Sequence, residues 1–463
     1  MKVLVLNGSP KGKLSVTVHS AKFLQSLFKE DQFEFVNIGI QIKHIEKNFN
    51  VIIESILNAD LILFSYPIYT FLVPYQLHKF IELLKKYIKE NQIDLSDKFV
   101  TQITTSKHFY DHTAHQFIED NVHDLGMLVL KGFSADMTDL LNEKGQAQVQ
   151  SFWQLIHFQI TNQMIFPKKA IQNHEFQSHI LDINTEYQYS ENQKKSTKDV
   201  VIVTDLEETD QNLINMVHYF RVHFSYKTRL INLRDFPFKS GCLGCFKCAT
   251  TGNCVIPDQF DLFLRSEILN GDAIVYAFTI KDHSMGSLFK LYDDRQFCNG
   301  HRTVSIGKPI GYIVNGRYEL EFNLQTIIES RAQVGQQYLA GVARNDFEEN
   351  GKTQTQQSII HLAKQMEYAL ENKVNLPQNF YGIGGLKIFR DLIFETQGLM
   401  KEDYKFYKKH QFFDFPHKNW KSILFMKFFG LLMSNRSLQK KYAHKLNQFI
   451  IQPYQKIIER STK

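Results

Sequence analysis

The residues best suited to chemistry in this 463-residue chain are its cysteines. All five lie between Cys242 and Cys298, and four of them fall within thirteen residues with the spacing Cys-x2-Cys-x2-Cys-x5-Cys. Gly244 and Gly252 stand between them and allow the tight backbone turns that wrap a loop around an inorganic cluster. We call residues 242–254 the cysteine loop; its four candidate ligands are Cys242, Cys245, Cys248 and Cys254.

This spacing favours a 4Fe-4S cluster over zinc, because zinc sites usually pair two separated Cys-x2-Cys knuckles. Zinc and unliganded, redox-active thiols are the two alternatives. Cys298 lies outside the motif and is predicted to be a buried thiol. An odd number of clustered cysteines, in a chain that starts without a secretory signal, indicates metal or redox chemistry rather than structural disulfides. We therefore expect a cytoplasmic protein.

A second chemical feature is the segment 7–17, Asn-Gly-Ser-Pro-Lys-Gly-Lys-Leu-Ser-Val-Thr, which follows the first predicted strand and leads into a helix. A turn of this kind lets backbone amides and the positive end of the helix converge on a phosphate. In this phosphate loop, Ser9, Ser15 and Thr17 can donate hydrogen bonds, and Lys11 supplies positive charge. The spacing is neither Gly-x-Gly-x-x-Gly nor that of a Walker loop, so it indicates neither a dinucleotide site nor an NTPase.

Alternating strand and helix patterns must position these features. A helix with Pro74 in its first turn is predicted between the third and fourth strands. Buried strands are predicted at residues 2–6, 33–38, 61–65, 99–103 and 127–131. Five strands with helices between them predict an α/β fold with a doubly wound parallel sheet of flavodoxin type, which binds ligands at the carboxyl ends of its strands.

The second part of the chain repeats this pattern. Residues 57–64 (LNADLILF) match residues 269–276 (LNGDAIVY), and Leu77 matches Leu288 after a slip of one residue, which suggests two copies of one domain. Chance similarity between two buried strands is the alternative. We expect a flavodoxin-like domain at 1–166, a polar linker at 167–198, a second flavodoxin-like domain at 199–376 and a mainly helical C-terminal extension at 377–463.

The phosphate loop resembles the opening loop of the NADPH-dependent FMN reductase family, Gly-Ser-Pro-Arg followed by Ser-Asn-Thr. This chain has Lys11 where Arg is usual, which keeps the charge, and Val16 where Asn is usual, which removes a polar contact. The family's Pro-x-Tyr turn, which brackets the isoalloxazine ring, and the loop at the ring's other edge have matches after the third and fourth strands. The resemblance implies FMN bound by Ser9, Lys11, Ser15, Val16, Thr17, Pro67, Ile68, Tyr69, Thr104, Thr105 and Ser106.

The cysteine loop is similar to that of the iron-sulfur flavoproteins, a branch of the same superfamily, and this resemblance covers about residues 1–375. In that family the cluster of one subunit approaches the FMN of its neighbour across a dimer interface. Here the phosphate loop occurs only in the first half and the cysteines only in the second, where acidic residues at 204–210 would repel a phosphate. The chain thus departs from the family's plan, and our hypothesis is that it is a covalent pseudo-dimer that retains one FMN and one 4Fe-4S cluster, placed face to face.

Flavin exchanges electrons in pairs or singly and a 4Fe-4S cluster singly, so the pair suits conversion of a two-electron exchange into single-electron steps. We expect reduction by NAD(P)H at the flavin or by a ferredoxin-like protein at the cluster. No residue stands out as a general acid or base, although His108, Asp111 and His112 are candidates to line the substrate side.

Two other functions fit the sequence: a cluster-free NAD(P)H:quinone or nitro-compound reductase, and a non-catalytic electron carrier or redox sensor. The net charge is +6 and the lysines and arginines are scattered, which argues against a nucleic-acid partner. No apolar stretch reaches the roughly 18 residues that a transmembrane helix needs.

Overall fold

The computed structural model describes residues 1–164, 166, 189–347, 350–434, 451–452 and 454–461. The chain divides into two compact units, Met1–Lys405 and Phe406–Lys463. Most of the predicted linker at 167–198 lies outside the described residues, and the strand β7 already begins at Lys195. The domain boundaries stay predictions.

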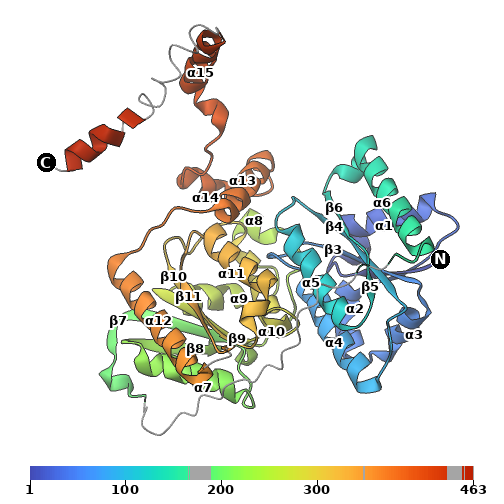
Figure 1. The fold of residues 1–463 in the computed structure, drawn as a ribbon, viewed down its shortest axis with the longest axis horizontal. Helices are drawn as coiled ribbons and strands as arrows, with labels where there is room; N and C mark the ends of the chain where they lie inside the picture. Colours follow the sequence, from blue (N-terminus) through green and yellow to red (C-terminus); the bar gives the residue numbers. More distant parts are fainter. Residues whose placement is uncertain (165, 167–188, 348–349, 435–450, 453, 462–463) are drawn as a thin grey trace. The chain divides into compact units, whose positions relative to one another are not determined.

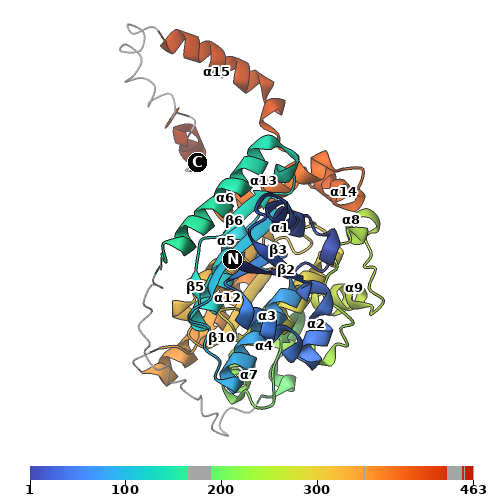
Figure 2. The ribbon, with the colours of Figure 1, turned by 90° about the vertical axis from the view of Figure 1, so that its right-hand side faces the viewer.

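The first half of the larger unit is a parallel sheet with helices on both faces (Figures 1 and 2). The strand order is β2-β1-β3-β4-β5, and β6 also pairs with β4. This order confirms the predicted flavodoxin-type sheet. The strands are β1 (Lys2–Asn7), β2 (Gln32–Val36), β3 (Leu61–Pro67), β4 (Phe99–Ser106), β5 (Leu128–Val129) and β6 (Phe133–Asp136), and the helices are α1 (Val16–Leu27), α2 (Ile38–Lys47), α3 (Asn50–Asn58), α4 (Tyr75–Asn91), α5 (Asp111–Asp124) and α6 (Glu143–Thr161).

Alternate side chains of each strand supply the two cores of this half. Leu4 and Leu6 of β1 pack with the apolar faces of α2, α3, α4 and α5. Val3 and Val5 face the other way and pack with α1 and α6. Because both faces are covered, the strands are nearly continuous hydrophobic runs, and this is why they could be predicted from the sequence.

The fifth predicted strand, at 127–131, is only partly right. The structure has two short strands there, β5 and β6, which pair with different ends of β4. A Cβ atom on Gly132, which lies at the break, would come within 2.3 Å of the Gln102 side chain. Gln102 accepts a hydrogen bond from Tyr66 and donates to the carbonyl of His115, so its side chain takes the space that a regular strand would fill.

The second half contains a sheet of the same topology. Its order, β8-β7-β9-β10-β11, matches that of the first sheet strand for strand along the chain. The two faces are again covered by separate cores. The strands are β7 (Lys195–Thr204), β8 (Tyr226–Asn232), β9 (Ala273–Thr279), β10 (Pro309–Asn315) and β11 (Tyr338–Arg344), and the helices are α7 (Gln211–His223), α8 (Lys247–Thr251), α9 (Phe260–Phe263), α10 (Gly286–Arg295), α11 (Phe322–Val334) and α12 (Gly351–Asn372).

The two halves also share local hydrogen bonds. Asp60 accepts a bond from the amide of Lys2, and its counterpart Asp272 accepts one from the amide of Asp199. After the third strand of each half comes a tight turn with two left-handed residues, at 69–72 and at 281–284. The acceptors Asp60 and Asp272 and the two turns are separated by the same number of residues along the chain. The slip of one residue suggested by Leu77 and Leu288 is therefore wrong. That alignment paired residues of the same apolar type and not residues at equivalent positions of the backbone.

Equivalent helices meet where the halves join, α4 against α10 and α5 against α11. Glu82 of α4 accepts hydrogen bonds of 2.6 Å from both the amide and the hydroxyl of Ser287, in the first turn of α10. Reciprocally, Asp294 of α10 accepts one of 2.7 Å from the amide of Tyr75, the first residue of α4. Each carboxylate thus stabilises the positive end of the opposite helix, as in a two-fold symmetric dimer. We call this junction the seam.

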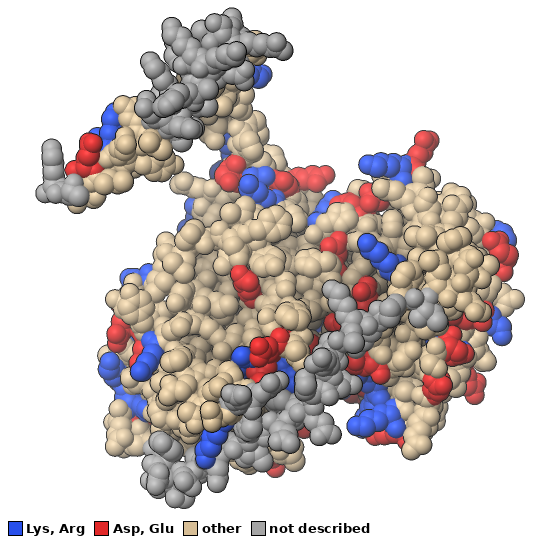
Figure 3. Space-filling model, viewed as in Figure 1, with Lys and Arg blue, Asp and Glu red and all other residues tan. Residues whose placement is uncertain are grey.

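The described residues after 377 are mainly helical, as predicted, in α13 (Phe380–Glu395), α14 (Lys401–Lys409) and α15 (Trp420–Met433). Among the described residues, no helix has the length and apolar character needed to cross a membrane. On the face drawn in Figure 3, basic and acidic side chains are interspersed and no single basic patch dominates.

Candidate functional site

The phosphate loop runs from the end of β1 to the start of α1. Asn7, the last residue of β1, holds the loop in place: its amide nitrogen donates to the carbonyl of Gly12 at 2.9 Å, and its amide oxygen accepts from the nitrogen of Ser9 at 3.1 Å. The predicted donors Ser9, Ser15 and Thr17 are buried. Lys11 is exposed, as is the side chain of Val16, so Val16 can contribute only through its backbone amide.

The N-terminus of α1 is open to an anion. Its N-cap residue, Ser15, makes no capping hydrogen bond with its side chain. The amides of the first turn have no acceptor within their own helix, and together with the serine and threonine hydroxyls they form a donor set that fits a phosphate.

The equivalent loop of the second half is closed instead. Asp210 caps α7 by accepting a hydrogen bond from the amide of Leu213 at 3.3 Å. Lys281 lies 3.6 Å from Asp205 and 3.2 Å from Glu207, and burial raises the pKa of Asp205 to about 6. Carboxylates occupy the positions that a phosphate would need, so these residues do not fit a second FMN.

The two other predicted flavin loops lie at the same sheet edge, since β1, β3 and β4 are neighbours. The hydroxyls of Thr17 and Thr105 are hydrogen-bonded, which joins the start of α1 to the end of β4. Tyr69 is buried in the turn after Pro67, with Ile68 packed on the core beside it. The hydroxyls of Thr104 and Ser106 already have partners within this half, so they are less available to a ligand; these partners are His115, Ser134 and the amide of His108.

The cysteine loop holds four free thiols at the edge of the second half. Gly244 and Gly252 have left-handed backbones, with φ of +61° and +81°, and Cys248 lies on the short helix α8 between them. The amide of Gly244 donates to the sulfur of Cys242 at 3.5 Å, the type of bond that supports a sulfur ligand. The fifth thiol, Cys298, is buried, as predicted.

Burial raises the pKa of Cys242 to about 12 and that of Cys248 to about 11. Both thiols are therefore protonated at neutral pH without a metal, and metal binding must release their protons. An all-sulfur donor set on one loop, with a backbone amide directed at a sulfur, fits an iron-sulfur cluster.

The cysteine loop touches the predicted flavin residues of the first half. A Cβ atom on Gly244 would lie 1.9 Å from the Tyr69 hydroxyl and 3.2 Å from the side chain of Lys11. The Lys11 ammonium lies 5.1 Å from the centre of the Phe246 ring, and Lys290 donates to the carbonyl of Tyr69 at 2.6 Å. The chain therefore brings its phosphate loop, its Pro-x-Tyr turn and its cysteine loop together at one place on the seam.

This contact predicts a difference between two glycine substitutions. Gly244→Ala should lower the free energy of unfolding by about 3 kcal/mol, since left-handed backbone strain adds to a clash with the buried Tyr69 hydroxyl. Gly307 has φ of +72° and no atom near its Cβ position, so Gly307→Ala should lose only about 1 kcal/mol. Urea unfolding measures both. The extra loss should shrink in a Tyr69→Phe background; equal losses in the two glycine variants would rule out the contact.

Asp111 and His112 begin α5, and His108 lies in the turn between the end of β4 and this helix. The Nδ1 atom of His108 lies 2.9 Å from Asp111, whose carboxylate also accepts a hydrogen bond from Ser134. Although burial raises the pKa of Asp111, the bonds from Ser134 and His108 outweigh burial and lower this pKa. Sequence reasoning missed His115, whose Nε2 lies 2.9 Å from the Thr104 hydroxyl. The only signal for it was its position one helical turn after Asp111.

His115 predicts an acid sensitivity of folding. Burial lowers its pKa to about 4, whereas an unfolded histidine titrates near 6.5. Below pH 6.5 the unfolded chain binds a proton that the folded chain excludes, so this group should cost about 2 kcal/mol of stability between pH 7 and pH 5. Urea unfolding of His115→Gln at the two pH values should show a smaller loss than the wild type. The same loss in both proteins would refute this assignment.

Comparisons with known proteins agree with the fold of the first half. A family model described as a flavodoxin-like fold matches residues 1–151. No curated protein matches the chain. Among solved structures, an NAD(P)H:quinone oxidoreductase from Methanothermobacter marburgensis is 12% identical, covers 40% of this chain and 100% of its own, and has a TM-score of 0.29.

Two further structures show similarly distant resemblance. An FMN-dependent NADH-azoreductase from Bacillus anthracis, in complex with FMN, is 14% identical over 34% of this chain and 98% of its own, with a TM-score of 0.24. The Trp repressor binding protein from Bacillus subtilis is 19% identical over 32% of this chain and 94% of its own, with a TM-score of 0.25.

Proposed function

We propose that this chain is an NAD(P)H-dependent flavin oxidoreductase with FMN in its first half and a 4Fe-4S cluster in its second. The observation that carries the proposal is the contact of Gly244 and Phe246 of the cysteine loop with Tyr69 and Lys11. When bound, FMN supplies hydride and single-electron chemistry, and the cluster supplies single-electron transfer. The quinone reductase and azoreductase among the structures of similar fold are consistent with such a reaction.

In this proposal the residues of the chain bind and orient the two groups. The open N-terminus of α1, with Ser9, Ser15 and Thr17, holds the phosphate, and Lys11 balances its charge. The rigid turn at Tyr69 would pack against the ring system when FMN is bound. Cys242, Cys245, Cys248 and Cys254 hold the cluster, so the two halves act as a pseudo-dimer within one chain. Free thiols suit the reducing cytoplasm.

Anaerobic purification followed by counts of flavin, iron and sulfide tests the proposal. We expect about one FMN and about four iron and four sulfide per chain, and bleaching of the flavin absorbance by NADH or NADPH. Zinc or no metal beside a reducible FMN would favour a cluster-free quinone or nitro-compound reductase. Both cofactors without turnover of artificial acceptors would favour an electron carrier or redox sensor.

A further inference from the structure

His78 of α4 is a buried polar side chain without a partner. Its exposed fraction is 0%, and neither ring nitrogen has a hydrogen-bond partner. The ring contacts Phe117, with 4.6 Å between ring centres, but that contact satisfies neither nitrogen. A buried polar group without a hydrogen-bond partner destabilises the fold by about 1–3 kcal/mol. A ligand bound to the imidazole would remove this cost.

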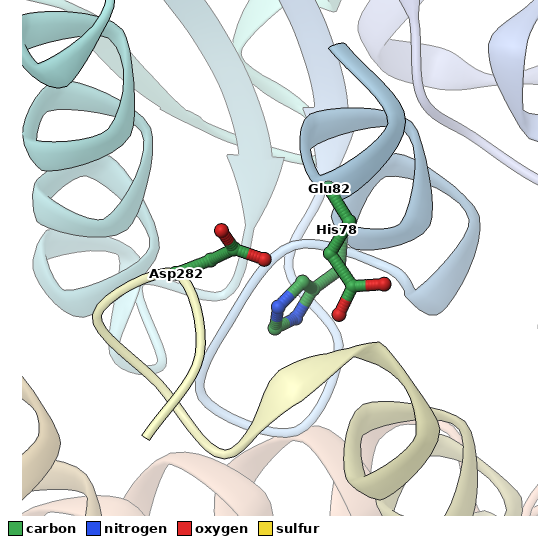
Figure 4. A group of neighbouring side chains, drawn as sticks. All are labelled: His78, Glu82 and Asp282. Carbon is green, nitrogen blue, oxygen red and sulfur yellow. The ribbon is translucent and has the colours of Figure 1, made fainter. Parts of the chain in front are cut away.

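Two carboxylates converge on His78. Glu82 lies one helical turn later on α4, and Asp282 comes from the turn of the opposite half. One ligand atom from each of the three residues lies within 4.8 Å of the others. Figure 4 shows the imidazole between the two carboxylates. One nitrogen and two carboxylate oxygens are donors that transition-metal ions accept.

Neighbouring groups hold these carboxylates in position. Ser287 donates to both oxygens of Glu82, and Lys79 lies 3.4 Å from one of them. Lys85 lies 3.3 Å from Asp282. Hydrogen-bonded partners of this kind orient carboxylates at metal sites. A cavity of about 910 Å³ is lined by both carboxylate residues, Glu82 and Asp282, together with Lys79, Lys85 and Ser287, while His78 is fully buried.

At the equivalent position of the other half, a lysine ammonium occupies the place that the His78 imidazole takes in the first half. At the offset that relates the halves, His78 corresponds to Lys290 and Glu82 to Asp294. The Lys290 ammonium is buried, pairs with Asp294 and donates to the carbonyl of Tyr69 in the opposite turn. That half therefore places its own cation between the carboxylate and the turn. On the first half's side the same place holds the His78 imidazole and an extra carboxylate, Asp282.

We infer that His78, Glu82 and Asp282 bind a divalent transition-metal ion that links the two halves at the seam. Two ligands come from the first half and one from the second, so a bound ion resists separation of the halves. Zinc and manganese both suit the donor set. This site is separate from the flavin loops and from the cysteines, and it stands whether or not those bind their groups.

Manganese(II) is the probe of choice, because thiolates of the cysteine loop would compete for zinc while manganese prefers oxygen and nitrogen ligands. The full chain, purified anaerobically and stripped with a chelator, is titrated with MnCl2 while the EPR signal of free Mn²⁺ is followed. We expect about one bound ion per chain, retained in Cys245→Ser and accompanied by a higher Tm.

His78→Gln and Asp282→Asn should each raise the Kd for Mn²⁺ at least about tenfold and abolish the rise in Tm. Asp282 lies in a tight turn outside the core and its side chain is partly exposed, so this variant tests the site even if His78→Gln folds poorly. The control His44→Gln changes an exposed histidine of α2 and should bind like the wild type. Equal affinity in the wild type and both ligand variants, or loss of binding only in Cys245→Ser, would overturn the inference.

Discussion

Cys245→Ser is expected to reduce the iron of the anaerobically purified chain from about four atoms to less than about one, with a parallel loss of sulfide and of the visible cluster absorbance. A serine hydroxyl is a much weaker ligand for a cluster iron than a cysteine thiolate. Cys245 is exposed, so the substitution leaves the packing of the second half intact. Iron and sulfide assays measure the effect, and urea unfolding verifies the fold.

The matched control is Cys298→Ala, which removes the fifth thiol. Cys298 is 2% exposed and belongs to a core cluster of the second half. We expect this variant to lose some stability, because a buried side chain is truncated, but to keep its iron. Full iron content in Cys245→Ser, or loss of iron in Cys298→Ala alone, would show that the ligands are assigned wrongly.

Ser15→Asp is expected to weaken FMN binding by at least about 100-fold, or about 2.7 kcal/mol. A carboxylate at the N-cap of α1 would repel the phosphate, and two like charges about 4 Å apart interact by several kcal/mol near a protein surface. Aspartate is also a good N-cap residue, so the helix itself should be stabilised. The second half already has this arrangement at Asp210. Flavin fluorescence titration of the deflavinated protein gives the Kd.

The variant Ser15→Asn distinguishes the effect of a negative charge at the N-cap from the effect of a larger side chain there. Asparagine caps a helix as well as aspartate does but carries no charge, so this variant should lose no more than about tenfold in affinity. If both variants bound FMN as tightly as the wild type, or if Asp205→Asn in the second half abolished FMN binding instead, the phosphate would not lie at α1.

The sheets could be predicted from sequence because their strands are buried on both faces. The hydrophobic runs at 2–6 and 61–65 mark their strands, whatever lies around them. The break in the fifth strand could not be predicted, since it depends on the side chain of Gln102, on the neighbouring strand. The alignment of the two halves was predicted wrongly for a similar reason. Apolar residues recur by chance in both sequences, whereas the true correspondence follows from hydrogen bonds such as that from the amide of Tyr75 to Asp294.

The candidate site was predictable where the ligand-binding residues are contiguous. The segments 7–17 and 242–254 each carry their spacing within one loop. Contacts between different loops produce no recognisable spacing in the sequence. Ser287 and Glu82 are 205 residues apart, and in the sequence His78 is one of several polar residues of an amphipathic helix. Only the folded chain shows that Asp282 meets it, and that Gly244 meets Tyr69.

The most direct test of electron exchange across the seam is rapid anaerobic mixing with NADH or NADPH, followed by freezing and EPR of the reduced cluster. The wild type, loaded with both groups, should develop the signal within its turnover time. Flavin-free Ser15→Asp, with its iron intact, should not. Equal signals in the two proteins, or none in the loaded wild type whose flavin has been reduced, would contradict a relay between the halves.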